Sequence, residues 1–175
     1  MSDEPNTAPA SSRVTFSHSK RRVIEAIVIL ALAFATGAIG SRATIPNIPT
    51  WYEGLIKPAF NPPNWIFGPV WTVLYLTMSY ACWRVLGCTS DRAARRSIGL
   101  VFVIQLFFNA LWSIVFFGLM NPLWGLLVVA CLEASVIAMI LVFARFDRMA
   151  AATQLPYAAW VAFASLLNLA IVLLN

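Results

Sequence analysis

Residues 51–75 read WYEGLIKPAFNPPNWIFGPVWTVLY, and this stretch decides the fold. It holds three tryptophans and four prolines between two strongly apolar segments. Its first part combines glycine, lysine and proline, which is typical of a stiff loop. From the pair Pro62-Pro63 onward it is mostly apolar, and proline is tolerated in a first helical turn. The stretch is therefore expected to be a loop that enters a helix.

The whole chain is more apolar than a soluble domain. Of its 175 residues, 61% are hydrophobic and 11% are charged, whereas a soluble domain is about half apolar and about a quarter charged. A core of this size cannot hide so much apolar surface, so the composition predicts a membrane protein. The net charge of +5 does not indicate a nucleic-acid partner, because the basic residues cluster between apolar segments, where they orient membrane proteins.

Five segments are long and apolar enough for a spanning helix, which needs roughly 20 residues. Residues 1–19 lack hydrophobic periodicity and are expected to be a disordered polar tail. The very short turn at Asn121-Pro122 makes the third and fourth helices antiparallel neighbours. We therefore expect an all-α membrane domain at 20–175, a bundle of five transmembrane helices at 23–43, 64–86, 98–119, 123–146 and 154–174.

The charges of the loops orient this bundle. With five spans, one side of the membrane receives every lysine and arginine except Arg42 and Lys57. The positive-inside rule then puts the N-terminus in the cytoplasm. We expect a multi-pass protein of a bacterial cell membrane, with the loop 51–64 on the opposite side.

The sequence gives little indication of a metal site or of catalytic residues. The three cysteines, Cys82, Cys88 and Cys131, are scattered, and the single histidine, His18, lies in the tail. No cysteine spacing fits a zinc site, and no nucleophile and base pair is visible. We expect no metal site, no catalytic residue and no required cofactor, and a binding protein is favoured over an enzyme.

Polar and aromatic residues share faces on three of the expected helices. Positions three, four and seven apart lie on one side of a helix. Amides that faced lipid would lack partners, so these faces should point into the bundle. A pocket lined by them would suit a flat, hydrophobic, partly polar ligand. The faces are Trp71 with Tyr75, then Gln105 with Asn109 and Trp112, then Trp160 with Ala164 and Asn168.

Two glutamates lie inside apolar segments. Glu25 is one turn from the start of its helix, beside Arg21 and Arg22, which favours a structural role. Glu133 is halfway along the fourth helix, where an ionisable group is costly and is a functional candidate by default. It is a candidate proton site, and a buried protonated glutamate bonded to a neighbouring helix is the alternative.

Small residues recur at four-residue spacing in two helices. Such faces let helices approach closely in lipid. They serve either packing within the bundle or a homodimer interface, and the sequence leaves both open. The two sets are Ala33, Gly37 and Ser41 in the first helix, and Ala130, Ala134 and Ala138 in the fourth.

Three sets of motifs are spread in order over residues 23–175. They are Trp51-Tyr52, Leu55, Lys57-Pro58, Pro62-Pro63, Trp65, Gly68-Pro69, Trp71 and Leu74-Tyr75, then Gln105, Asn109, Trp112 and Phe116-Phe117-Gly118, then Pro156-Tyr157, Trp160, Ala162-Phe163-Ala164 and Leu167-Asn168. Together they resemble the translocator protein family, once called the peripheral benzodiazepine receptor family. Its bacterial members are called tryptophan-rich sensory proteins.

This resemblance implies a five-helix bundle that usually dimerises and a ligand pocket closed by the first loop. Porphyrins, such as protoporphyrin IX or haem, are the implied ligands. The implied lid contains Trp51, Lys57, Pro62 and Pro63, with Lys57 either a partner for a ligand carboxylate or a solvent-facing lysine. The predicted pocket residues are Trp71, Tyr75, Gln105, Asn109, Trp112, Trp160 and Ala164, of which Tyr75 and Gln105 are added from their helix faces.

The implied function is tetrapyrrole transport, sensing or regulation, and two alternatives stay open. One is a proton-coupled secondary transporter that uses Glu133, and the other is a light-dependent porphyrin-degrading protein. Animal members carry a cholesterol-recognition motif with a tyrosine and an arginine near the end of the fifth helix. Residues 167–175 here contain neither, so sterol recognition through that motif is not expected.

Overall fold

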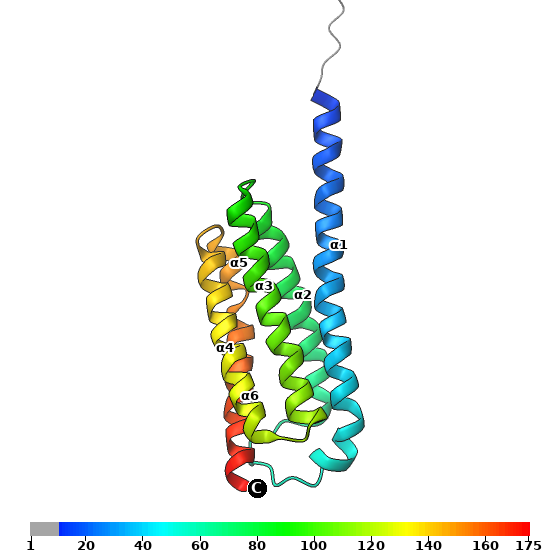
Figure 1. Cartoon of the computed structure of the whole chain (residues 1–175), viewed down its shortest axis with the longest axis vertical. Coiled ribbons are helices and arrows are strands. Elements are labelled where there is room, and N and C mark those ends of the chain that lie inside the picture. Colours follow the sequence, from blue (N-terminus) through cyan, green and yellow to red (C-terminus); the bar gives the residue numbers. More distant parts are fainter. Residues whose placement is uncertain (1–10) are drawn as a thin grey trace, which may run out of the picture.

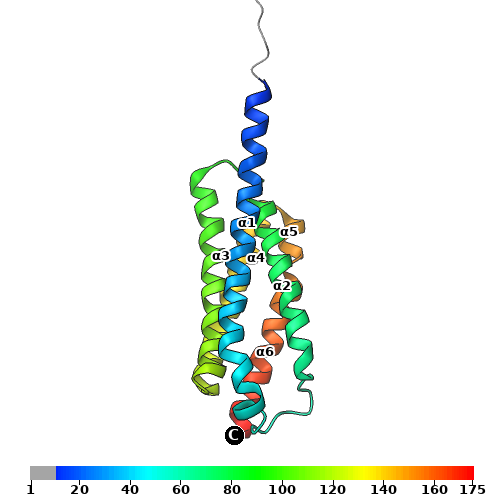
Figure 2. The same ribbon diagram turned by 90° about the vertical axis from the view of Figure 1, so that its right-hand side faces the viewer.

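The computed structural model describes residues 11–175, with side chains from Lys20 onward, and it is an all-α bundle (Figure 1). Five helices run along its length and one short helix joins the last two. In Figure 2, α1 lies in front, between α2 and α3, with α4 behind it. The helices are α1 (Ser11–Thr44), α2 (Phe67–Leu86), α3 (Arg92–Ser113), α4 (Pro122–Ala144), α5 (Arg148–Ala152) and α6 (Leu155–Leu174).

The bundle has the length and composition of a membrane domain. Four helical stretches are apolar and long enough to cross a bilayer: Lys20–Tyr52, Arg92–Gly118, Pro122–Ala144 and Arg148–Leu174. The fifth helix, α2, is less apolar because it carries two tryptophans, two tyrosines and Arg84. It packs beside α1 in the same bundle. The expected five-helix architecture is confirmed.

The first helix is longer than the sequence predicted. It begins at Ser11, so residues 11–19 are helical where a disordered tail was predicted, and residues 1–10 lie outside the described residues. Extending an existing helix needs no new nucleation, which favours this continuation. At its other end, α1 continues through a 3₁₀ turn, Ile45–Asn47, and a π turn, Ile48–Tyr52. Trp51 is therefore at a helix end and not in a loop.

Capping aspartates lie at the starts of α3 and α5. Asp91 accepts a hydrogen bond of 2.7 Å from the backbone N–H of Ala94, and α3 starts at Arg92. Hydropathy placed that start at residue 98, because the polar first turn lies outside the apolar segment. Asp147 likewise caps the short helix α5, which the sequence analysis missed.

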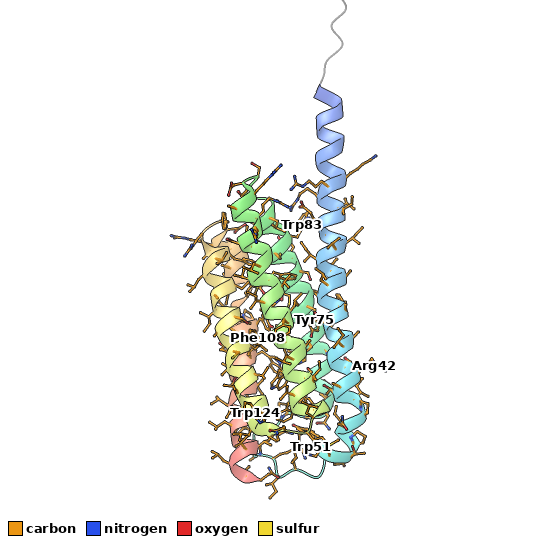
Figure 3. The ribbon with its side chains drawn as sticks, viewed as in Figure 1. Arg42, Trp51, Tyr75, Trp83, Phe108 and Trp124 are labelled. Carbon is orange, nitrogen blue, oxygen red and sulfur yellow. The ribbon has the colours of Figure 1, made fainter. Side chains whose placement is uncertain are left out.

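The end of the bundle near the N-terminus of α1 is held by ion pairs. Glu25 on α1 accepts from Arg21 at 2.9 Å, Arg22 at 3.1 Å and Arg95 of α3 at 2.6 Å. The Arg22 guanidinium lies 4.3 Å from the centre of the Trp83 ring on α2. Glu25 thus joins α1 to α3, and its partner Arg22 joins α1 to α2, in agreement with the predicted structural role. Figure 3 shows Trp83 toward this end and Trp51 and Trp124 toward the opposite one.

The two small-residue faces have different surroundings. On α1, Ala33 is fully buried, and a Cβ added at Gly37 would lie 2.7 Å from Tyr75 Cε2. That face packs within the bundle. On α4 the corresponding face is exposed, so it is free for lipid or a second copy, and the homodimer stays a prediction. Its exposed members are Ala130, Ala134 and Ala138.

Candidate ligand-binding site

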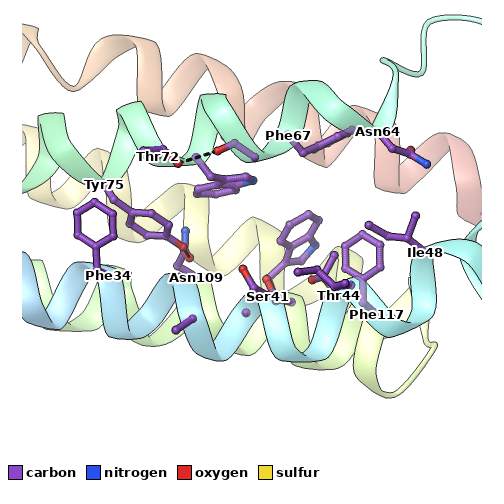
Figure 4. Close-up of a pocket in the computed structure, with 18 of the residues that line it drawn as sticks. Phe34, Ser41, Thr44, Ile48, Asn64, Phe67, Thr72, Tyr75, Asn109 and Phe117 are labelled. Atoms are coloured by element: carbon purple, nitrogen blue, oxygen red, sulfur yellow. Dashed lines mark hydrogen bonds between the residues drawn. The ribbon is translucent and has the colours of Figure 1, made fainter.

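A cavity of about 630 Å³ opens between α1, α2 and α3 (Figure 4). The first wall is the face of α1 that carries Phe34, Gly37, Ser41 and Thr44. The second wall comes from α2, and α3 forms the back. Other lining residues are Phe67, Trp71 and Tyr75 on α2, Asn109, Trp112 and Ser113 on α3, and Tyr52, Asn64, Trp65 and Phe117 near the loop end.

Helix periodicity produces this lining. Residues three, four and seven apart share a face, and Phe34, Gly37 and Ser41 follow that spacing on α1. Trp71 and Tyr75 do the same on α2, and their ring centroids lie 5.8 Å apart. Gly37 lets α1 approach Tyr75 closely, and the cavity lies between this face of α1 and the two rings.

The inner end of the cavity is a chain of buried hydrogen bonds. The Tyr75 hydroxyl donates to Asn109 Oδ1 at 2.7 Å, and Asn109 Nδ2 donates to the Tyr157 hydroxyl at 3.1 Å. Tyr157 donates to Gln105 Oε1 at 2.9 Å, and Gln105 Nε2 donates to Met78 Sδ at 3.5 Å. The chain joins α2, α3 and α6, so these polar groups stabilise the wall without facing lipid.

A second set of bonds fixes Trp112 at the back of the cavity. Its indole Nε1–H donates to Asn168 Oδ1 at 3.3 Å, and Asn168 Nδ2 donates to the Pro122 carbonyl at 2.7 Å. The Trp112 ring stacks on Phe116 with centroids 5.7 Å apart. The orientation of this ring is therefore set before any ligand arrives.

Four of the seven predicted pocket residues line the cavity: Trp71, Tyr75, Asn109 and Trp112. Gln105 is fully buried behind them. Trp160 packs against Phe67 with ring centroids 5.8 Å apart. Ala164 borders a second, much smaller space of about 20 Å³. Trp160 and Ala164 do not line the large cavity because they are on α6, which is not one of the helices that enclose it. Gln105 is on α3 and bonds to Tyr157 of α6.

The sequence did not predict that α1 lines the cavity. The spacing of Gly37 and Ser41 predicts a small-residue face for helix packing or a homodimer. Phe34 and Thr44 carried no signal of their own. The sequence does show a small-residue face on α1 and an aromatic face on α2. That these two faces lie opposite each other follows only from the packing of α1 against α2.

The loop 53–63 connects two stretches that line the cavity. Tyr52 precedes it, and the Tyr52 hydroxyl donates to Asn61 Oδ1 at 2.8 Å. Lys57 Nζ donates to the carbonyls of Glu53 and Leu55 at 3.0 and 3.1 Å and lies 5.0 Å from the Tyr52 ring centre. Lys57 is thus held by the loop and does not line the cavity.

The other predicted lid residues flank this loop. Trp51 makes an edge contact with Phe116 at 5.5 Å between ring centroids. Pro62 and Pro63 lead into the 3₁₀ turn Asn64–Ile66, whose first two residues line the cavity. The placement is compatible with a lid, and the roles of Trp51, Lys57, Pro62 and Pro63 stay predictions.

Glu133 lies on α4, away from the lining of the large cavity. Its Oε2 is buried and has no hydrogen-bond partner among the described residues. The described residues as a whole contain no group of three or more histidine, cysteine, aspartate or glutamate side chains that could hold a metal ion. Glu133 therefore stays a candidate proton site separate from the cavity.

Known proteins resemble this chain over most of its length. The model of the TspO/MBR family matches residues 27–174. The "Tryptophan-rich protein TspO" of Archaeoglobus fulgidus is 43% identical over 156 residues, which cover 87% of this chain and 95% of that protein. The protein of the same name from Chlorobaculum tepidum is 38% identical over 89% of this chain and 98% of its own.

A human protein extends the similarity beyond prokaryotes. The human "Translocator protein" is 35% identical over 133 residues, which cover 74% of this chain and 78% of that protein. The family match covers the loop 53–63, α2, α3 and the part of α1 that lines the cavity. The chain belongs to the TspO/MBR family, and it is a multi-pass integral membrane protein.

Proposed function

We propose that the protein binds porphyrins and similar flat, hydrophobic ligands in the cavity between α1, α2 and α3, for tetrapyrrole transport, sensing or regulation. The observation that carries this proposal is the cavity itself. Its volume of about 630 Å³ lies in the range of small-molecule sites, about 300–1,000 Å³. Indole and phenol rings line it beside a few polar groups, which is the composition that planar ligands require.

The polar groups give such a ligand an orientation. Ser41, Thr44 and Ser113 bring hydroxyls to the lining, and Asn109 brings an amide that is already bonded to Tyr75. The described lining of the cavity contains no histidine, cysteine or methionine to coordinate a haem iron. Stacking and shape complementarity therefore supply the binding energy, and protoporphyrin IX suits this site without an axial ligand.

A filled-cavity variant tests the proposal. Ser41→Phe places a ring inside the lining, whereas Ala35→Phe places the same ring on an exposed position of α1 outside it. Protoporphyrin IX is titrated into each purified protein in nanodiscs and followed by porphyrin absorbance. We expect Ser41→Phe to lose most of its affinity and Ala35→Phe to keep it. Equal affinities would refute binding in this cavity.

Proton-coupled transport is a second candidate function, favoured by the unpartnered Oε2 of Glu133. A carboxyl group buried without a partner in a membrane helix is a candidate proton carrier. The test is pH-dependent porphyrin flux in proteoliposomes. Loss of the pH dependence in Glu133→Gln would support this function, and unchanged flux would remove it.

A further inference from the structure

The side chain of Asn175 pairs with the backbone of Ile56 at both polar groups. The Ile56 N–H donates to Asn175 Oδ1 at 3.0 Å, and Asn175 Nδ2 donates to the Ile56 carbonyl at 3.0 Å. Asn175 Nδ2 also donates to the Ile171 carbonyl at 2.9 Å. The last turn of α6 therefore orients this amide, and the amide holds one residue of a loop that is far away in sequence.

Ile56 lies within the loop 53–63, which joins the cavity residues Tyr52 and Asn64. The loop meets α6 at a second point, where the ring centroids of Phe60 and Phe163 lie 6.2 Å apart. It is also tied to Tyr52 through Asn61. A displacement of the loop at Ile56 would consequently be passed to Tyr52 at the cavity wall.

We propose that Asn175 is a latch for the loop 53–63 and sets the rate at which a ligand exchanges with the cavity between α1, α2 and α3. The proposal rests on the proposed function, because it needs a ligand in that cavity. Ile56 itself is 60% exposed, so burial of its own side chain does little to hold this residue in place. The paired hydrogen bonds to Asn175 supply the attachment there.

A latch has a kinetic signature that differs from that of a contact residue. Releasing it raises the population of open loop, and the open loop admits and releases ligand. The association and dissociation rate constants should then rise together while Kd changes little. Loss of one or two exposed hydrogen bonds corresponds to a rise of about three- to tenfold in both rate constants.

Hydrogen exchange tests the latch without any ligand. In Asn175→Ala, amides of the loop 53–63 should exchange faster than in the wild type. Asn47→Ala is the matched control, because the Asn47 amide donates to the Ala43 carbonyl of its own helical segment at 3.0 Å. Equal exchange in the loop of Asn175→Ala and the wild type would overturn the latch.

Stopped-flow mixing with protoporphyrin IX tests the gating role. We expect both rate constants to rise in Asn175→Ala, to stay unchanged in Asn47→Ala, and to be intermediate in Asn175→Asp, which keeps the acceptor for the Ile56 N–H and loses the donor. Wild-type rates in an Asn175→Ala protein that binds would overturn gating alone. Absence of binding to the wild type would refute the proposed function and the gating with it, whatever hydrogen exchange shows.

Discussion

The Tyr75 hydroxyl donates a 2.7 Å hydrogen bond to Asn109 Oδ1 and thereby joins α2 to α3 at the inner end of the cavity. Asn109 is 3% exposed, so bulk water does not readily replace a lost donor. The same Asn109 passes the connection on to Tyr157 of α6. One polar chain thus fixes the positions of the three helices that meet at this end.

Tyr75→Phe should destabilise the bundle while keeping its ring packing. The substitution leaves a buried carbonyl oxygen without a donor, which costs about 1–3 kcal/mol. Thermal unfolding in detergent measures the effect. Tyr80→Phe is the control, because Tyr80 is 49% exposed and surface changes stay within about 0.5 kcal/mol. Equal stability of the two variants would refute a stabilising role for the buried chain.

Gly37→Ala should also destabilise the protein. The new Cβ would lie 2.7 Å from Tyr75 Cε2, and the hydrogen bond to Asn109 keeps that ring from moving away. Overpacking costs about 1–3 kcal/mol, which exceeds the gain of up to about 1 kcal/mol from higher helix propensity. Gly99→Ala is the matched control on α3, where no atom lies within 4 Å of the added Cβ. A Gly37→Ala protein that melts at or above the wild-type temperature would contradict this packing.

Acid should weaken the contact between α2 and the turn before α5. The backbone N–H of Ala150 and the guanidinium of Arg84 donate to Asp147, and they hold the pKa of that carboxyl below its ordinary value. Because the folded pKa is the lower one, the stabilisation is present above pH about 4 and is lost as the pH falls through the folded pKa. Melting temperatures of the wild type and Asp147→Asn, which keeps a capping oxygen, should differ at pH 7 and converge in acid. A difference that is constant with pH would contradict this.

The sequence predicted the five helices and two of the three cavity walls. The inward faces of α2 and α3 can be predicted, because amide side chains that pointed to lipid would lack partners. These faces carry Trp71 with Tyr75 and Asn109 with Trp112. The α1 wall was not predicted, since Gly37 and Ser41 are compatible with packing, dimerisation or a cavity. Only the position of Tyr75 opposite Gly37 decides among these.

The predicted pocket residues of α6 also show what the sequence could not determine. Trp160 shares a face with Ala164, and that face does point inward, but it meets Phe67 and a small space instead of the large cavity. Periodicity fixes the direction of a face relative to its own helix. Which neighbour it meets depends on how five helices are arranged, and local sequence does not encode that. The hydrogen bonds between Asn175 and Ile56 could not be predicted, because a single amide after α6 has no periodic partner.

Porphyrin affinity of two tryptophan variants tests the central claim most directly. Trp71 lines the cavity, whereas Trp124 on α4 is 61% exposed and lies outside it. In titrations of protoporphyrin IX followed by quenching of the remaining tryptophan fluorescence, Trp71→Leu should bind about fivefold or more weakly, as expected for loss of ring stacking worth about 1 kcal/mol or more. Trp124→Leu should bind like the wild type. Wild-type affinity in Trp71→Leu, or an equal loss in both variants, would contradict a porphyrin site between α1, α2 and α3.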